Sequence, residues 1–315
     1  MQISNESFLS ARNFANKIWN ASRFIIMNAE GVTDIPTTPQ SAELADTWIL
    51  SEFARMAKKV SENYNTYDMD AAARELYDFF WTKFCDWYIE LSKIRMTSSD
   101  TATKQQVLSV LLYVLKESLK LLSPIMPYIS EEIWATLNHD KGLICESAFE
   151  FSAVKIDDVS LNTMETLMEI IVKIRTIRSE MNISPAAKIN AVFNVLDKNK
   201  KEILEKNVAY VKTLAKMENL TIGENLERPK GSASAITSSF EVFIPLEGLI
   251  DLSKERGRIE KEIKLCQAEA ERAKAKLSNA NFIANAPKEE IERIKIKLQD
   301  ASLKIEKLNE SLKYL

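Results

Sequence analysis

The chain of 315 residues holds few of the groups that catalytic and metal sites need. Its one histidine, His139, cannot supply a His-x-x-x-His pair, and its three cysteines, Cys85, Cys145 and Cys266, lack the paired spacing of a zinc site. The sequence contains no glycine-rich phosphate loop and no Gly-x-Ser-x-Gly turn. We therefore expect no metal site and no self-contained catalytic centre.

Long apolar runs are missing as well. The longest run, Val110–Leu115, is far shorter than the roughly 20 residues that span a bilayer, and no basic-then-apolar signal segment opens the chain. Three scattered cysteines also argue against a disulfide framework. These absences predict a protein of the reducing cytoplasm that has no membrane partner.

The composition that remains favours helices and more than one domain. Hydrophobic residues make up 46% of the chain and charged residues 28%, with few glycines for the tight turns of all-β folds. Single hydrophobic cores rarely grow beyond about 250 residues. The net charge of −3 is uneven, because residues from Leu252 onward hold 15 Lys and Arg against 11 Asp and Glu, or +4, which leaves −7 for the rest. We therefore expect a polyanion to bind to local positive patches and to this last segment, and not to be attracted by the overall charge.

The pattern along the chain predicts a mainly α protein with three domains. Residues 1–150 are expected to form an antiparallel helical bundle, 151–250 a small α+β module, and 251–315 a coiled-coil hairpin. In the bundle, helices are expected from near Ser7 to Asn28, from after Ser41 to about Asn65, after Asp68, after Ser99, and at 130–137 beyond a proline-rich break at 123–127. In the module we expect a helix from Leu161, strands at INAVFNV, ENLTIG, ASAITSSF and EVFIPL, and one helix over NKKEILEKNVAYVKTLAKM.

Two heptad stripes predict the hairpin. Apolar residues recur in steps of four and three, first at Ile259, Ile263, Cys266, Ala270, Ala273, Leu277 and Ala280, then at Ile291, Ile294, Leu298, Ala301, Ile305, Leu308 and Leu312. Between the stripes, Pro287 and two acids are typical of a helix start. We expect two antiparallel helices, each roughly 40 Å long, that project as an arm.

The stretch RNFANKIWNASRF, Arg12–Phe24, raises a question about its polar side. A step of 100° per residue places Phe14, Ile18 and Ile25 on one face, and five polar residues on the other with Trp19 at the flank. The five are Arg12, Asn13, Asn16, Asn20 and Arg23. Guanidinium forks, amides and an aromatic ring are the groups that read unstacked RNA bases, yet the same face suits solvent or a neighbouring helix. Periodicity leaves both interpretations open, and Lys17, off this stripe, is expected to be free to reach phosphate.

A resemblance to a known protein family favours the interpretation that this face contacts RNA. RNFANKIWNASRF, LADTWIL, LYDFFWTKFCDWYIELSK and LSPIMPYISEEIW resemble, in order and spacing, the anticodon-binding helical domain of class I valyl-tRNA synthetases. LEGLIDLSKERGRIEKEI and KLSNANFIANAPKEEIERIKIKL are similar to the coiled-coil arm of that family. The arm disfavours the isoleucyl and leucyl enzymes, which end differently. Ser123, before Pro124, departs from the histidine that relatives often carry there.

The resemblance implies recognition of tRNA, with the valine acceptor as partner. The implied contacts in the bundle are Arg12, Asn13, Asn16, Lys17, Asn20 and Arg23. The implied contacts on the arm are Lys261, Lys264, Arg272, Lys276, Arg293 and Lys297, with Phe282 or Ile283 at the tip. The His-Ile-Gly-His and Lys-Met-Ser-Lys-Ser elements of the family do not occur. We therefore expect a monomeric, non-catalytic part of a valine–tRNA ligase, whose catalytic half, in the same polypeptide, would use ATP and magnesium.

Several residues keep a structural alternative. The arm cations could form ion pairs on a solvated coiled-coil face, and Arg175 and Arg178 could either pin their helix onto the bundle or approach the RNA stem. The aromatic residues Phe79, Phe80, Trp81, Phe84, Trp87 and Tyr88 are expected to be core. Cys85 is expected to be buried and His139 exposed. The rival functions are an isoleucyl or leucyl anticodon module and a protein-binding scaffold.

Overall fold

The computed structural model divides into two compact units, Met1–Thr166 and Leu167–Leu315. The residues that it describes are 5–33, 35, 39, 43–138, 142–148, 154–237, 239–279 and 287–314. His139, Phe282 and Ile283 lie outside the described residues. The domain boundaries predicted at residues 150 and 250 stay predictions.

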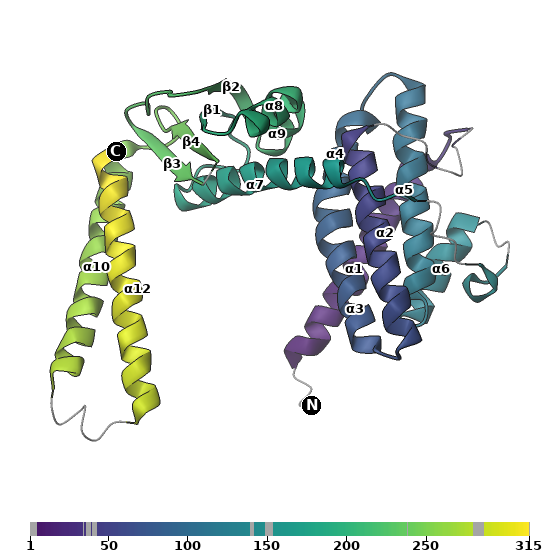
Figure 1. The fold of residues 1–315 in the computed structure, drawn as a ribbon, viewed down its shortest axis with the longest axis horizontal. Helices are drawn as coiled ribbons and strands as arrows, with labels where there is room; N and C mark the ends of the chain where they lie inside the picture. The colour runs from purple at the N-terminus through teal and green to yellow at the C-terminus, as the bar shows by residue number, and fades with distance from the viewer. Residues whose placement is uncertain are drawn as a thin grey trace. The chain divides into compact units, whose positions relative to one another are not determined.

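The first unit is a helical bundle (Figure 1). Its helices are α1 Asn5–Ala29, α2 Leu44–Asn65, α3 Met69–Asp78, α4 Ile89–Met96, α5 Thr101–Leu122 and α6 Pro127–Asn138, with a π-helix at Phe79–Tyr88 and a short 3₁₀ turn at Ile144–Glu146. Two of the predicted helix starts have a capping side chain. Asp68 accepts a hydrogen bond from the backbone N–H of Ala71, and Asp100 accepts one from the backbone N–H of Thr103. The prediction of a helical bundle is confirmed.

The aromatic residues of the π-helix form the bundle core, as predicted. Phe79, Phe80, Phe84, Trp87 and Tyr88 are all buried, whereas Trp81 is half-buried. The sequence predicted a plain α-helix here. The wider π turn brings residues four and five apart together, so the Phe84 ring lies 6.3 Å from the rings of both Phe79 and Tyr88.

The second unit contains a four-stranded sheet in the order β2-β1-β4-β3. Its elements are α7 Asp158–Glu180, which starts in the first unit, then β1 Ile189–Val195, α8 Lys198–Lys206, α9 Val208–Leu214, β2 Met217–Gly223, β3 Ser232–Ile236 and β4 Phe240–Pro245. Strands β1 and β2 are parallel, and the other two pairs are antiparallel. The four predicted strands are confirmed, except that the strand predicted at ASAITSSF ends at Ile236 and its last residue, Phe240, begins β4. The one predicted helix between β1 and β2 is instead two, because Asn207 leaves helical geometry with its amide bonded to the Ile203 carbonyl.

Two long helices, α10 Leu252–Ser278 and α12 Lys288–Tyr314, form the hairpin at the end of the chain (Figure 1). The predicted stripes face each other: Ile259, Ile263, Cys266, Ile294 and Ala301 are all buried. Across the hairpin the Lys304 ammonium lies 2.9 Å from the Glu262 carboxylate. The coiled-coil prediction is therefore confirmed. Among the described helices, none has an apolar stretch long enough to cross a membrane.

Candidate nucleic-acid interface

Helix α1 exposes the predicted polar face. Ile18 and Ile25 are fully buried on one side, and the five predicted residues on the other side, Arg12, Asn13, Asn16, Asn20 and Arg23, are all exposed. Within the described part of the chain, none of the five makes a side-chain hydrogen bond or an ion pair. Trp19 at the flank is 44% exposed. The face thus presents free donors, free acceptors and an aromatic surface to solvent.

Lys17 differs from this face. Its ammonium lies 2.6 Å from the Asp86 carboxylate and 3.8 Å from the centre of the Trp81 ring. That ring in turn stacks on Tyr77, with centroids 5.5 Å apart. The sequence predicted that Lys17 would be free to reach phosphate, and this prediction is wrong. Lys17 instead joins α1 to the π-helix. A phosphate would have to compete with a carboxylate and a cation–π contact.

The arm carries both paired and unpaired cations. All six predicted residues are exposed. Arg293 has Glu290 at 4.0 Å, but Lys261, Lys264, Arg272, Lys276 and Lys297 form no ion pair with any residue that the structure describes. Other arm cations do pair, as Arg258 does with Glu262 at 2.9 Å. The ion-pair alternative therefore holds for some arm residues and not for these five.

Three of the unpaired cations line one groove along the hairpin. The groove lies between α10 and α12 and has Cys266, Ala273, Ile294 and Ala301 among its apolar residues. Its cations are Arg272, Lys276, Lys297 and Lys304, and its acids are Glu269, Glu290 and Asp300. Sequence reasoning missed Lys304, although its place beside Ile305 in the second stripe put it at the edge of the helix pair. Cations spaced along two neighbouring helices can contact successive phosphates of a nucleic acid. The acids in the same groove weaken the binding of such a polyanion.

Arg178 and Arg175 pin α7 within the second unit. Arg178 is 7% exposed, and its guanidinium donates to the carbonyls of Ser184 at 2.7 Å, Ala187 at 2.8 Å and Ala215 at 3.2 Å. Burial lowers the pKa of Arg178. Arg175 donates to the Leu214 carbonyl. These hydrogen bonds join both residues to the turn after α7 and to the end of α9, whereas the sequence offered the bundle or the RNA stem as their partners.

The cysteines show no common site. Cys85 is half-buried, Cys145 is exposed and Cys266 is buried in the arm. Burial raises the pKa of Cys85 to about 12, so its thiol is unreactive near neutral pH. The described residues contain no cluster of three or more His, Cys, Asp or Glu side chains that could hold a metal ion.

Comparison with known families identifies most of the bundle and the whole arm. Residues 46–193 match the family described as the anticodon-binding domain of tRNA ligase, and residues 251–315 match the valyl tRNA synthetase tRNA binding arm. The chain carries the anticodon-binding domain and the arm of a valyl-tRNA synthetase. The hairpin of α10 and α12 is thus the valyl-tRNA synthetase arm, and α1 precedes the matched part of the anticodon-binding domain.

Individual valine–tRNA ligases align along nearly the whole chain. The Enterococcus faecalis protein is 37% identical over 322 residues, covering 100% of this chain and 36% of its own length. The Listeria innocua protein is 38% identical over 302 residues, covering 95% of this chain and 34% of its own length. The Carboxydothermus hydrogenoformans protein is 39% identical over 293 residues, covering 91% and 33%. The chain spans about a third of the length of these relatives.

Proposed function

We propose that the chain recognises valine tRNA as the carboxy-terminal part of a valine–tRNA ligase. In this proposal the polar face of α1 reads the anticodon and the arm contacts the outer corner, or elbow, of the tRNA. The observation that carries the proposal is that this face holds five exposed polar side chains with no partner among the described residues. A face that served only to pack the bundle would have partners.

The side chains of the α1 face suit single-stranded RNA. Arginine donates through a planar fork, and asparagine both donates and accepts, so together they can address the edges of unpaired bases. Trp19, at 44% exposure, offers a surface on which a base can stack. Such stacking contributes about 1–3 kcal/mol per base. Specificity for the anticodon would therefore come from the bundle.

The arm contributes position and affinity. Its five unpaired cations can replace the counterions of phosphate groups, which favours binding without reading sequence. Affinity should then fall as salt rises, with a slope of log K against log salt that counts the phosphate contacts.

The chemistry of the reaction would lie outside this chain. The partners we propose are valine tRNA and the catalytic half of the same polypeptide, which would bind ATP and magnesium. We expect the whole enzyme to be a cytoplasmic monomer. The chain by itself should catalyse no valine-dependent pyrophosphate exchange, and measurable exchange by the pure chain would contradict this division of labour.

Binding measurements test the proposal. Fluorescence anisotropy would compare a labelled valine tRNA, an isoleucine tRNA and a valine tRNA with a swapped anticodon, each at two salt concentrations. We expect a preference for the valine anticodon that Arg23→Ala removes. The matched control is Arg74→Ala, which removes another exposed bundle arginine, one paired with Asp70 on α3. Equal binding of all three RNAs, or equal effects of the two substitutions, would contradict anticodon reading by α1.

A further inference from the structure

Lys17 lies at the edge of the polar face of α1. An α-helix turns about 100° per residue, which places Lys17 about 40° from Asn13 and about 60° from Asn20 around the helix axis. Its side chain is 23% exposed, and that of Asp86, its partner on the π-helix, is 50% exposed. An ammonium group beside the proposed RNA-reading side chains is therefore paired with a carboxylate at 2.6 Å.

Trp81 holds Lys17 in place independently of this carboxylate. The ammonium lies 3.8 Å from the centre of the Trp81 ring, which stacks on Tyr77 with centroids 5.5 Å apart. The Tyr77 ring in turn lies 4.8 Å from the ring of Phe14 on α1. None of these contacts involves Asp86, so neutralising its carboxylate should leave the ammonium at the edge of the face.

The Asp86 carboxylate cancels the charge of Lys17. Its effect is seen at Cys85, whose pKa, raised to about 12 mainly by burial, is lowered by Lys17 and raised by Asp86. Exposed ion pairs contribute little to stability, and α1 already buries Ile18 and Ile25 in the bundle. The pair therefore matters more for the charge beside the face than for the stability of the fold.

A second lysine on the same side of α1 is neutralised as well. Lys93 of α4 lies 5.5 Å from the centre of the Phe24 ring on α1, and it pairs with the Glu90 carboxylate at 2.5 Å. In contrast, Arg12 and Arg23, exposed on the polar face, form no ion pair with any residue that the structure describes. Arginine can address a base edge through its planar fork, whereas lysine binds phosphate as a point charge. The cations suited to bases are thus unpaired, and the two lysines beside them are paired with acids.

We propose that Asp86 is a specificity-determining residue for tRNA recognition by the α1 face. An RNA whose bases are read has a fixed backbone, whereas an RNA with the wrong anticodon can shift until a phosphate meets an unpaired ammonium. Asp86 prevents this contact, because it occupies the Lys17 ammonium and repels an approaching phosphate. A protein gains specificity when it disfavours the wrong partner in this way. The inference rests on the proposed function, in which α1 reads the anticodon.

The experiment measures binding of the chain to two RNAs, the anticodon stem-loop of valine tRNA and the same stem-loop with a swapped anticodon. Fluorescence anisotropy would be recorded at several salt concentrations. At the lowest salt, Asp86→Asn should raise affinity for the swapped stem-loop at least threefold and affinity for the valine stem-loop by less. One added phosphate contact should also steepen the slope of log K against log salt by about 0.7. In the Asp86→Asn/Lys17→Met protein, affinity and slope should return to the parent values.

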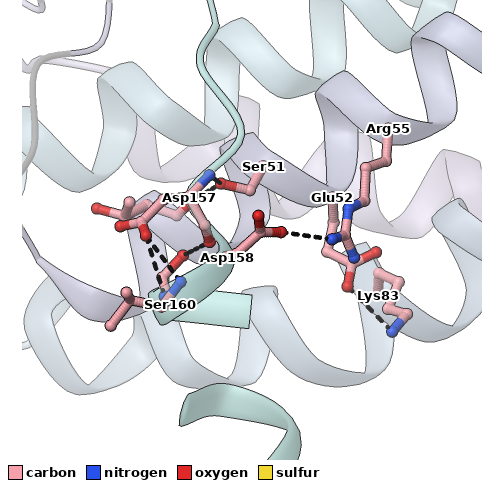
Figure 2. Close-up of polar contacts among 9 residues, drawn as sticks. Ser51, Glu52, Arg55, Lys83, Asp157, Asp158 and Ser160 are labelled. Carbon is pink, nitrogen blue, oxygen red and sulfur yellow. Dashed lines mark hydrogen bonds and ion pairs between the residues drawn. The ribbon is translucent and has the colours of Figure 1, made fainter. Parts of the chain in front are cut away.

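The matched control removes an acid from another exposed ion pair of the first unit. Asp158→Asn changes the net charge by the same amount and deprives Arg55 of its partner at 2.8 Å, in a pair that joins α7 to α2 (Figure 2). It should change the affinity for either stem-loop by less than twofold. A gain confined to Asp86→Asn is then not an effect of net charge. Tryptophan fluorescence would verify that the bundle of each variant is folded.

The outcomes separate the two proposals. A narrower anticodon preference with a steeper salt slope, both reversed by Lys17→Met, supports the role of Asp86. Unchanged affinity, an equal gain for both stem-loops, a gain that Lys17→Met does not reverse, or the same gain with Asp158→Asn overturns it. If the parent chain binds the two stem-loops equally, the proposed function fails, and the salt slopes alone decide whether Asp86 neutralises Lys17.

Discussion

A buried carboxylate at the start of α2 offers the sharpest test of the bundle's energetics. Asp46 is 0% exposed, and it accepts a hydrogen bond from the Tyr88 hydroxyl at 2.7 Å and pairs with Arg95, whose side chain is 14% exposed. These contacts join α2 to the π-helix and to α4. Replacing Asp46 by alanine removes the charge that both partners face in a place with little water.

The expected loss of stability follows from that burial. Removing one partner of a buried ion pair destabilises a protein by about 3–5 kcal/mol, because the remaining charge stays desolvated. Tyr88→Phe removes one hydrogen bond to a charged group and should cost about 1.5–3 kcal/mol. The double variant should lose less than the sum, since in Asp46→Ala the hydroxyl has already lost this acceptor. The control, Arg74→Ala, breaks a pair that is 68% and 76% exposed and should cost under about 0.5 kcal/mol.

Urea unfolding followed by tryptophan fluorescence measures these changes in the bundle alone. All five tryptophans lie before residue 167, so their emission does not report the second unit. With a slope of about 2 kcal/mol per molar urea, Asp46→Ala should lower the midpoint by roughly 1.5–2.5 M. A shift no larger than that of Arg74→Ala would refute the claim that this buried pair holds α2 in the bundle.

Three further predictions concern the two RNA surfaces and the thiols. Arg12→Ala and Arg23→Ala should each weaken valine tRNA binding by about 1–3 kcal/mol and relax anticodon preference in anisotropy titrations, whereas uniform weakening with every tRNA would mean phosphate contact only. Ile263→Ala opens the core between α10 and α12 and should cost about 2–4 kcal/mol, seen as faster amide exchange confined to the arm, and unchanged exchange would contradict the hairpin packing. At pH 8 iodoacetamide should modify Cys145 at least tenfold faster than Cys85, whose pKa of about 12 leaves little thiolate, and equal rates would contradict its burial.

Periodic patterns predicted most of the fold. The steps of four and three in the tail predicted both arm helices, and Ile259 and Ile294 are buried where the heptads place them. The alternation in INAVFNV predicted β1, and the helices expected after Asp68 and after Ser99 begin with the capping side chains of Asp68 and Asp100. These features depend on residues near one another in sequence, so a local reading is sufficient.

Contacts between distant residues could not be predicted in this way. Lys17 has the same charge as a phosphate-binding lysine, and only folding brings it to Asp86, 69 residues further along. Arg178 was expected to lie on a helix, but its carbonyl partners belong to the turn after α7 and to Ala215, the residue that ends α9. For the α1 face the sequence identified which residues share a side, and the structure added that they lack partners among the described residues.

The most direct test of the account is a hydroxyl-radical footprint of the chain on a valine tRNA. We predict two separate protected regions, the anticodon loop and the elbow. A variant with Lys261, Lys264, Arg272, Lys276 and Lys297 changed to glutamine should lose protection of the elbow and keep that of the anticodon loop. Protection of neither region, or protection that vanishes from both together, would contradict the claim that the bundle reads the anticodon and the arm positions the tRNA.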